Sequence, residues 1–393
     1  MVEALPTYYE FSAGGGMACA GLGNGWRCSF ANDFDPMKAA TYSANWGGDH
    51  LVCGDVRAVL VSALPGKADL AWASFPCQDL SLAGDCAGLG SSTSEAMTRS
   101  GTFWPFWALM QGLKAEARAP RVIVLENVCG MLTSHAGRDF GAICAALSDA
   151  GYRFGAVVVD AVHFVPQSRQ RVFLIAVDGD CALPPGVAAK VPSKEWHPRA
   201  LVGAYLKLAS GCRSKWLWWS LPRPPARTAV LADLIEDNPS HVKWHTAEET
   251  GRLLCMMSPL NQAKIKLAKG AGMRLVGGVY KRTRPDGNGG KVQRAEVRFD
   301  DVSGCLRTPS GGSSRQTIIV VDGDQVRSRL LSPREAARLM GLPPDYKLPA
   351  RYNDAYHLAG DGVCVPVVRH LANALLEPII AANRPLPGAV AAE

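Results

Sequence analysis

Residues 8–23, YYEFSAGGGMACAGLG, contain the stretch that decides the fold. A short apolar run leads directly into a cluster of glycines, and an acidic residue, Asp33, follows the next apolar run. Glycines let the backbone approach a ligand, and a carboxylate at the end of a second strand can accept hydrogen bonds from ribose hydroxyls. The layout indicates a nucleoside site. The dinucleotide fingerprint would need glycine where the chain has Cys19, which disfavours NAD and favours a ligand without a pyrophosphate.

The same rhythm continues outward from this stretch to about residue 180. Apolar runs such as LAWASF (70–75), RVIVL (121–125) and RVFLIAV (171–177) alternate with segments typical of helices. Continuous β-branched runs suit strands that are buried on both faces. We therefore predict an α/β fold with a mostly parallel, helix-covered sheet.

Beyond residue 182 the parallel-sheet rhythm stops. A tryptophan cluster follows at Trp216, Trp218 and Trp219, which we expect to serve as core or hinge packing, and residues 270–316 are rich in Gly, Arg and Lys and indicate turns and loops. Near residue 329 a regular pattern returns, with Ser332 as N-cap, Pro333 in the first turn and Glu335 completing a capping box. A final amphipathic helix is expected to dock on the first region. The domains are accordingly predicted as 1–185, 186–328 and a returning segment, 329–393.

Charge is unevenly distributed along the 393 residues. The formal net charge is +7, yet residues 190–330 hold 24 Lys and Arg against 12 Asp and Glu, which leaves the remainder at −5. A basic segment on a slightly acidic body favours a polyanion partner, because neutralising phosphates supplies affinity that does not depend on sequence. A solvated basic surface is the alternative.

Other features of the composition narrow the class of protein. No run of 18 apolar residues occurs and the first residues do not resemble a signal peptide, so we expect a cytoplasmic protein without a membrane partner. The 12 cysteines include no C-x-x-C pair and are expected to be reduced. His241 and His245, with Cys255 beyond them, give only a weak metal signature, and no metal is expected.

Side chains capable of chemistry follow several of the predicted strands. Cys77 lies in SFPCQDLS after one apolar run, and Glu126 lies in ENV after another. Arg169 and Arg171 are two residues apart, which places both on one face of an entering strand. Taken singly, each has a simpler explanation, since a cysteine after a strand is more often a buried structural residue and Glu126 an exposed loop acid.

The order of these motifs is more specific than any one of them. The series F-x-x-G-G-G, PCQ, ENV, Q-x-R-x-R and L-x-PRE-x-x-R-x-MG resembles the DNA (cytosine-5) methyltransferase family, from residue 8 to about 375 apart from the central segment. The resemblance implies a Rossmann-like, S-adenosylmethionine-dependent methyltransferase fold with a smaller, loop-rich target-recognition domain. It also implies an enzyme that flips a cytosine out of double-stranded DNA to make 5-methylcytosine.

Roles for individual residues follow from the resemblance. Cys77 would attack carbon 6 of cytosine, Glu126 would hold ring nitrogen 3 and Arg171 the exocyclic oxygen, while Arg169 would orient Cys77 and the base. Donor contacts are expected from Phe11, Gly15, Gly16, Asp33, Phe34, Asp55, Val56, Phe75, Asp361 and Val363. DNA contacts are expected from Gln78, Arg282, Arg284, Arg307 and Arg315.

Three positions depart from the family pattern. Ala13 and Cys305 stand where glycine and threonine are usual, and Asp361 lies in GDGV where the family has Gly-Asn-Ser-Val. An aspartate can accept but not donate a hydrogen bond, so retained donor binding is expected, with Asp361 as its weakest point.

Rival functions remain open at this stage. An RNA cytosine-5 methyltransferase would share the catalytic motifs, although the Cys-Phe-Thr stretch of the transfer-RNA relatives is absent. A catalytically silent DNA-binding protein and a nucleotide-dependent oxidoreductase are the others. We expect a monomer, with a cognate restriction endonuclease as a candidate partner.

Overall fold

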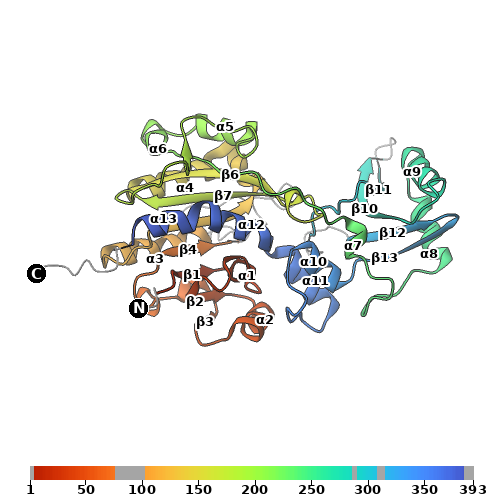
Figure 1. Ribbon diagram of the computed structural model, residues 1–393, viewed down its shortest axis with the longest axis horizontal. Coiled ribbons are helices and arrows are strands. Elements are labelled where there is room, and N and C mark those ends of the chain that lie inside the picture. The colour runs from red at the N-terminus through yellow and green to blue at the C-terminus, as the bar shows by residue number, and fades with distance from the viewer. Residues whose placement is uncertain (1–3, 76–101, 286–289, 308–314, 385–393) are drawn as a thin grey trace, which may run out of the picture. The chain divides into compact units, whose positions relative to one another are not determined.

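The computed structural model describes residues 4–75, 102–285, 290–307 and 315–384 (Figure 1). The chain divides into two compact units. Unit 1 comprises Met1–Val159, Gln170–Pro224 and Val363–Glu393, and unit 2 comprises Asp160–Arg169 and Pro225–Gly362. The chain therefore passes between the units four times.

Unit 1 is built on a seven-stranded sheet in the order β3-β2-β1-β4-β5-β7-β6. Pairing is parallel from β3 through β5, and β7 runs antiparallel to β5. This confirms the mostly parallel sheet. The strands are β1 (Thr7–Phe11), β2 (Arg27–Asp33), β3 (Leu51–Cys53), β4 (Leu70–Ala73), β5 (Val122–Val128), β6 (Tyr152–Asp160) and β7 (Gln170–Asp178).

The central strands are buried because helices cover the sheet, as the β-branched runs predict. Every residue of β4 is buried, and Val122 to Leu125 of β5 are fully so. The α-helices of unit 1 are α1 (Met17–Leu22), α2 (Pro36–Trp46), α3 (Phe103–Ala115), α4 (Arg138–Asp149), α5 (Arg199–Leu206), α6 (Ser210–Ser214), α12 (Val365–Leu371) and α13 (Glu377–Ala382). Short 3-10 turns lie at Val56–Ala58, Val61–Ala63, Cys129–Leu132 and Ser134–Gly137.

Residues 186–224 belong to unit 1, although their composition suggested a new domain. A short ladder joins β8 (Ala188–Ala189) to β9 (Trp218–Trp219). Trp216 packs edge-on against Phe154, and Trp219 donates from Nε1 to the carbonyl of Gly155 at 3.0 Å. The tryptophans are buried, which confirms core packing.

The last helical stretch packs back on unit 1, as its amphipathic pattern predicts. A Cβ added at Gly21 of α1 would lie 2.4 Å from the Cβ of Val368 in α12, so the two helices approach closely. Trp26 Nε1 donates to Glu377 Oε1 at 3.0 Å.

One helical stretch among the described residues, Tyr352–Ala382, is long and apolar enough to cross a membrane by length and composition alone. It includes a π-helical turn at Ala372–Leu376, and 56% of its most apolar window is buried.

Unit 2 is built on a four-stranded antiparallel sheet, in the order β11-β10-β12-β13. The expectation of turns and loops over 270–316 is wrong for two long strands, β10 and β11. The alternating pattern of KVQRAEVR forms β11, with Ala295 and Val297 facing the core. The strands are β10 (Leu275–Pro285), β11 (Lys291–Arg298), β12 (Thr317–Asp322) and β13 (Gln325–Leu330).

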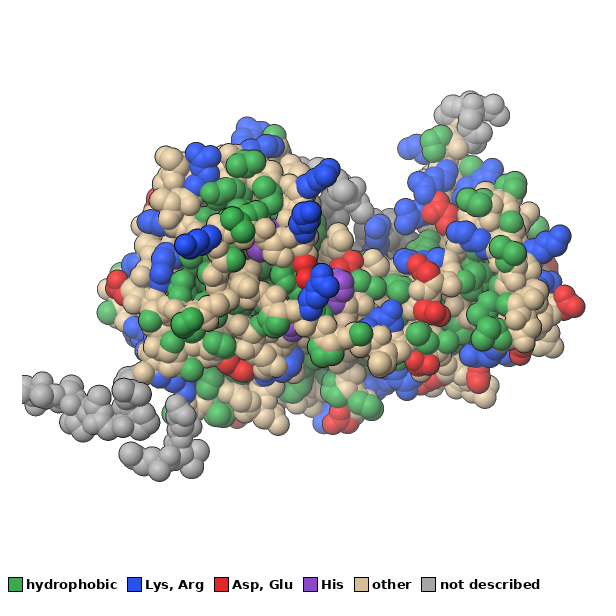
Figure 2. Space-filling model, turned by 45° about the horizontal axis from the view of Figure 1, so that its top comes forward, with side chains coloured by type: hydrophobic (Ala, Val, Ile, Leu, Met, Phe, Trp, Pro, Cys, Tyr) green, Lys and Arg blue, Asp and Glu red, His purple; other side chains and the backbone are tan. Residues whose placement is uncertain are grey.

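Helices of unit 2 complete a separate small core. Leu253, Ile265, Val279, Val297 and Ile319 meet there. Lys and Arg side chains gather on the surface near β10 and β11 (Figure 2). The helices are α7 (Leu231–Leu234), α8 (Ala247–Cys255), α9 (Pro259–Lys269), α10 (Pro333–Leu339) and α11 (Tyr352–Asp361), with a 3-10 turn at Ala161–His163.

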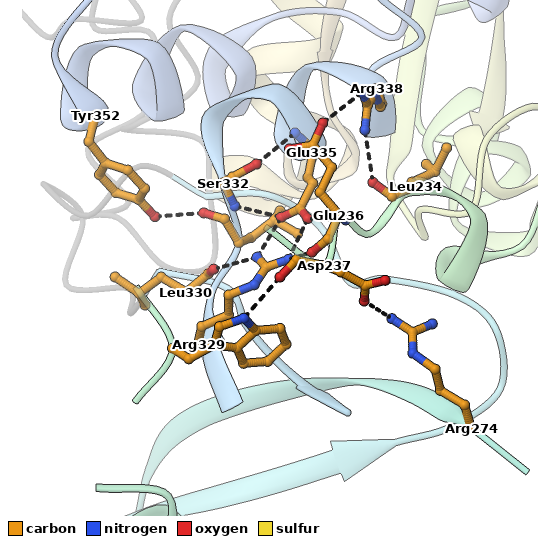
Figure 3. A network of polar contacts seen from close by, with 12 residues as sticks. Leu234, Glu236, Asp237, Arg274, Arg329, Leu330, Ser332, Glu335, Arg338 and Tyr352 are labelled. Atoms are coloured by element: carbon orange, nitrogen blue, oxygen red, sulfur yellow. Dashed lines mark hydrogen bonds and ion pairs between the residues drawn. The ribbon is translucent and has the colours of Figure 1, made fainter. Parts of the chain in front are cut away.

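A buried ion pair fixes the start of α10 (Figure 3). Arg329 and Glu335 are both fully buried, and Arg329 donates from Nη2 to Glu335 Oε1 at 2.6 Å and from Nη1 to Oε2 at 2.8 Å. Glu335 also accepts from the backbone N–H of Ser332, whose hydroxyl accepts from Glu335 N. The capping box predicted from the sequence is therefore confirmed, and the arginine is an addition to it.

Candidate active site

The glycine loop after β1 is held by Asp33 at the end of β2. Asp33 Oδ2 accepts from Gly14 N at 2.7 Å, and Oδ1 accepts from Asp35 N at 2.8 Å. Burial raises the pKa of Asp33. A carboxylate has about four acceptor positions. Two remain after these backbone bonds, so Asp33 can still accept from ligand hydroxyls.

Trp46 of α2 closes the other side of this loop, a role that the sequence analysis missed. Its Nε1 donates to the carbonyl of Gly15 at 3.0 Å. Gly16 has φ +76°, and a Cβ there would lie 2.2 Å from Trp46 Nε1. Only glycine fits at position 16, for conformational and steric reasons. The candidate donor residues Gly15 and Gly16 are thus positioned by one tryptophan.

The aromatic candidates differ in exposure. Phe34 is 73% exposed directly after Asp33, so its ring is open to a ligand. Phe11 packs in the core, with its ring 5.5 Å from that of Phe30, and Phe75 lies 5.8 Å from Phe103. Of these three aromatic side chains, only Phe34 is exposed enough for a ligand to stack on its ring.

Asp55 and Val56 lie in the turn after β3. The Asp55 carboxylate accepts from the backbone N–H of Arg57 and pairs with its guanidinium at 2.6 Å. Hydrogen bonds from the Arg57 side chain lower the pKa of Asp55. Val56 is partly buried against the unit 1 core.

Glu10 is a buried acid behind the glycine loop, and the sequence analysis passed over it although it interrupts the apolar run YYEF. Only 2% of it is exposed, and its Oε2 has no hydrogen-bond partner among the described residues. Burial, with a smaller contribution from the charge of Asp33, raises the pKa of Glu10 to about 8; a hydrogen bond from the Cys19 backbone opposes the shift. At neutral pH this carboxyl is therefore mostly protonated.

Glu126 and Arg171 come together at neighbouring strand ends. The antiparallel register sets Val128 of β5 opposite Arg171 of β7, so Glu126 is the diagonal neighbour of Arg171 on the same face. Arg171 Nε lies 3.1 Å from Glu126 Oε1, and both side chains are largely buried. The pair offers a carboxylate and a guanidinium side by side.

The neighbouring Asn127 fixes the chain that leads to the PCQ motif. Its Nδ2 donates to the carbonyl of Phe75 at 3.2 Å, which joins the end of β5 to the residue after β4. Cys77 and Gln78 lie outside the described residues.

Arg169 belongs to unit 2, and β7 of unit 1 begins one residue later, at Gln170. Its Nη2 donates to the carbonyls of Gly360 at 2.9 Å and Gly362 at 2.7 Å, and its Nη1 donates to Leu306 O at 3.2 Å and Cys305 Sγ at 3.4 Å. The expectation that Arg169 and Arg171 share one strand is therefore wrong. Arg169 ties the Cys305–Leu306 segment to the turn around Asp361.

The remaining candidates are spread over several elements and the segments between them. Asp361 is exposed at the end of α11, whereas Val363 is buried. Arg282 and Arg284 of β10 both pair with Glu296 of β11. Arg307 is exposed.

Arg315 is held by two side chains of α11. It donates to Asn353 Oδ1 at 2.5 Å and lies 5.5 Å above the Tyr352 ring.

The weak metal signature finds no support in the described part of the chain. His245 Nδ1 lies 2.9 Å from Ser328 Oγ, and Cys255 is exposed. No group of three His, Cys, Asp or Glu able to hold a metal ion occurs among the described residues.

The family model "C-5 cytosine-specific DNA methylase" matches residues 9–377. The chain is 26% identical over 347 residues to the type II methyltransferase M.NlaX of Neisseria lactamica, covering 88% of this chain and 87% of that one. It is 25% identical to M.HpaII of Haemophilus parainfluenzae, covering 95% and 90%.

Solved structures share the fold. Dnmt2 methyltransferase of S. pombe matches with a TM-score of 0.56 and 17% identity, over 95% of this chain and 99% of that one. A putative prophage-encoded DNA modification methyltransferase of E. coli matches with a TM-score of 0.57 and 14% identity, over 96% and 99%.

Proposed function

Since this chain belongs to the family of C-5 cytosine-specific DNA methylases, we propose that it is a sequence-specific enzyme that methylates carbon 5 of cytosine in double-stranded DNA, with S-adenosylmethionine as donor. The structural observation that best supports this proposal is the buried Glu126–Arg171 pair. A carboxyl and a guanidinium held side by side complement the ring nitrogen and exocyclic oxygen of a flipped cytosine.

The proposed chemistry uses Cys77 as nucleophile. Carbon 5 of cytosine is unreactive until the thiolate adds at carbon 6, since that bond makes the ring enamine-like. Carbon 5 would then attack the methyl group, whose bond to the sulfonium sulfur of the donor breaks to leave S-adenosylhomocysteine. Transfer of the proton on carbon 5 to water would return electrons to the ring and break the bond between carbon 6 and the Cys77 sulfur, which frees Cys77. Glu126 would hold the proton at ring nitrogen 3, and Arg171 would donate to the exocyclic oxygen.

The features around β1 and β2 fit the donor. S-adenosylmethionine, when bound, supplies an electrophilic methyl group. Asp33 has acceptor capacity left for ribose hydroxyls, and the exposed ring of Phe34 is available to adenine. The glycine loop, shaped by Trp46, would admit the methionine portion. Further donor contacts are proposed for Phe11, Asp55, Val56, Phe75, Asp361 and Val363.

Arg169 is proposed as a positioning residue, since its bonds to the carbonyls of Gly360 and Gly362 fix the backbone on either side of Asp361. DNA contacts are proposed for Gln78, Arg282, Arg284, Arg307 and Arg315. The two type II methyltransferases to which the chain is similar come from bacteria, which supports a cytoplasmic location. A monomeric state and a cognate restriction endonuclease as partner are part of the proposal.

The test compares the native protein with Cys77→Ala and a matched cysteine control, Cys255→Ala, on α8. Each is incubated with labelled S-adenosylmethionine and either mixed-sequence duplex DNA or RNA. Nucleosides from the digested products are then identified by mass. We expect 5-methylcytosine in DNA from the native protein and from Cys255→Ala, and none from Cys77→Ala.

Other outcomes would overturn parts of the proposal. Methylation of RNA alone would reject the substrate, and unchanged activity of Cys77→Ala would reject the nucleophile. Absence of transfer, with DNA still bound, would favour a silent DNA-binding protein.

A further inference from the structure

Strands β10 and β11 extend beyond the rest of the unit 2 sheet. The pairing of β10 with β12 ends at Val279↔Thr317, but its pairing with β11 continues to Pro285↔Lys291. Residues 280–285 and 291–296 therefore form a two-stranded ribbon, called here the β10–β11 ribbon (Figure 1). Strands rise about 3.4 Å per residue, so the ribbon is roughly 20 Å long.

This ribbon is exposed and basic. Residues 281–285 are all exposed, as are 291, 293 and 294, while Ala295 near its base is buried. Only Glu296 is acidic among the described residues of the ribbon. Its cationic residues are Lys281, Arg282, Arg284, Lys291 and Arg294.

The register sorts these cations between two faces. Arg282 is directly opposite Arg294, and Arg284 is opposite Val292, which places the three arginines on one face. Lys281 lies opposite Ala295, and Lys291 opposite Pro285, so the lysines occupy the other face. The arginines of the ribbon thus lie on one of its faces and the lysines on the other.

The arginine face is organised by one carboxylate. Glu296 Oε1 accepts from Arg284 at 2.5 and 2.9 Å, and its Oε2 lies 3.4 Å from Arg282. The Arg282 guanidinium also lies 5.9 Å from the Tyr280 ring centroid. Like charges directly opposite, such as Arg282 and Arg294, are unfavourable in an isolated sheet. An anionic partner would relieve that cost.

We propose that the β10–β11 ribbon enters the major groove of the target duplex, with its arginine face toward the base edges and its lysines toward phosphates. The inference rests on the proposed function and names the element that selects the site. The major groove is about 12 Å wide and admits a two-stranded ribbon, whereas the minor groove is about half as wide. Arginine pairs bidentately with guanine, so guanine is the base expected opposite this face. Lysine acts as a point charge on phosphate.

Two double variants of equal charge test this division of labour. Arg282→Ala/Arg294→Ala removes two cations from one face, and Lys281→Ala/Lys291→Ala removes two from the other. All four side chains are exposed, so both proteins are expected to fold. The control is Arg252→Ala on α8, an exposed arginine of the same unit that pairs with Glu248.

Two measurements are made on each protein. Duplexes bound from a randomised pool are sequenced, and the Kd for a fixed duplex is measured against salt. The arginine variant is expected to lose guanine preference and to bind the selected site about 100-fold more weakly. The lysine variant is expected to keep the preference and to lower the salt slope by about 2. Donor binding should not change in either.

The outcomes that would contradict the proposal can be told apart. Equal, sequence-independent losses in both variants would show that the ribbon contacts only phosphate, and unchanged binding in both would remove it from the interface. Failure of the proposed function would appear instead as a native protein that makes no 5-methylcytosine. The binding measurements would then still decide the role of the ribbon.

Discussion

Glu10 in unit 1 and Glu335 in unit 2 are both buried carboxyl groups, but their surroundings differ. Glu335 is paired with Arg329 and accepts from two backbone N–H groups, of Ser332 and Glu236 (Figure 3). Glu10 has an oxygen without a hydrogen-bond partner in the described chain, and burial raises its pKa to about 8. A buried acid is thus tolerated either because a cation is supplied or because the acid keeps its proton. Only the second arrangement makes stability depend on pH near neutrality.

Removing the cation of unit 2 should give the largest effect. Arg329→Met leaves Glu335 buried without its partner, which is expected to lower the free energy of unfolding by about 3–5 kcal/mol. Urea denaturation followed by tryptophan fluorescence measures it, because Trp244 lies 4.8 Å from the Arg329 guanidinium. A loss below about 1 kcal/mol would mean that the pair does not hold this region together.

Replacing the acid of unit 1 should change the response to pH. Glutamate ionises near 4.5 in the unfolded chain but keeps its proton to about 8 in the folded protein, so unfolding releases a proton between these values. Rising pH therefore lowers the stability of the native protein by up to about 1.4 kcal/mol per pH unit. The glutamine of Glu10→Gln does not ionise, so its unfolding releases no proton at this position.

The native protein should thus lose about 2 kcal/mol relative to Glu10→Gln between about pH 6 and about pH 7.5. Denaturation of both proteins at the two pH values measures this difference. Glu248→Gln, at an exposed acid, is the control and should show a constant offset. A constant offset for Glu10→Gln as well would mean that Glu10 is ionised in the folded protein.

Replacing both members of the unit 2 pair sharpens the contrast. Arg329→Met/Glu335→Leu removes the charge and its partner together, so the expected loss is about 1 kcal/mol, mainly from the lost N-cap contact at Ser332. Denaturation of this double variant beside Arg329→Met isolates the cost of an unpaired charge. If the double variant were as unstable as the single one, packing rather than charge would dominate.

The exposed pair Arg252–Glu248 should show the smallest effect. These residues lie one helical turn apart, with 65% and 79% of their side chains exposed. Arg252→Ala is expected to cost at most about 0.5 kcal/mol, a loss that added salt reduces. A larger change in the same denaturation experiment would contradict the view that burial decides the value of an ion pair here.

Much of unit 1, and the start of α10 in unit 2, follows from local sequence. The apolar run before Gly14 predicts a strand, and so does the β-branched run at 122–125. The spacing of Ser332 and Glu335 predicts the start of a helix. The structure has all three, as β1, β5 and α10. These signals are local, since alternation, capping and buried runs are visible within about ten residues.

Other features depend on partners far along the chain. Glycines in 270–316 suggested loops, yet Gly277 and Gly278 lie within β10, where a Cβ at Gly277 would meet Phe299 at 2.7 Å. Arg169 was placed by its spacing from Arg171, but the strand begins after it and its partners are Gly360 and Gly362. Glu10 and Trp46 gain their importance only from tertiary packing.

The contact between α1 and the closing helices has a consequence for synthesis. The hydrogen bond from Trp26 to Glu377 joins residues 351 positions apart. A ribosome adds about 5–20 residues per second, so the closing helices are synthesised roughly 20–70 s after α1. Throughout that time the apolar surface of α1 that later meets Val368 lacks its cover. The nascent chain therefore passes through a long interval in which unit 2 can fold before unit 1 is complete.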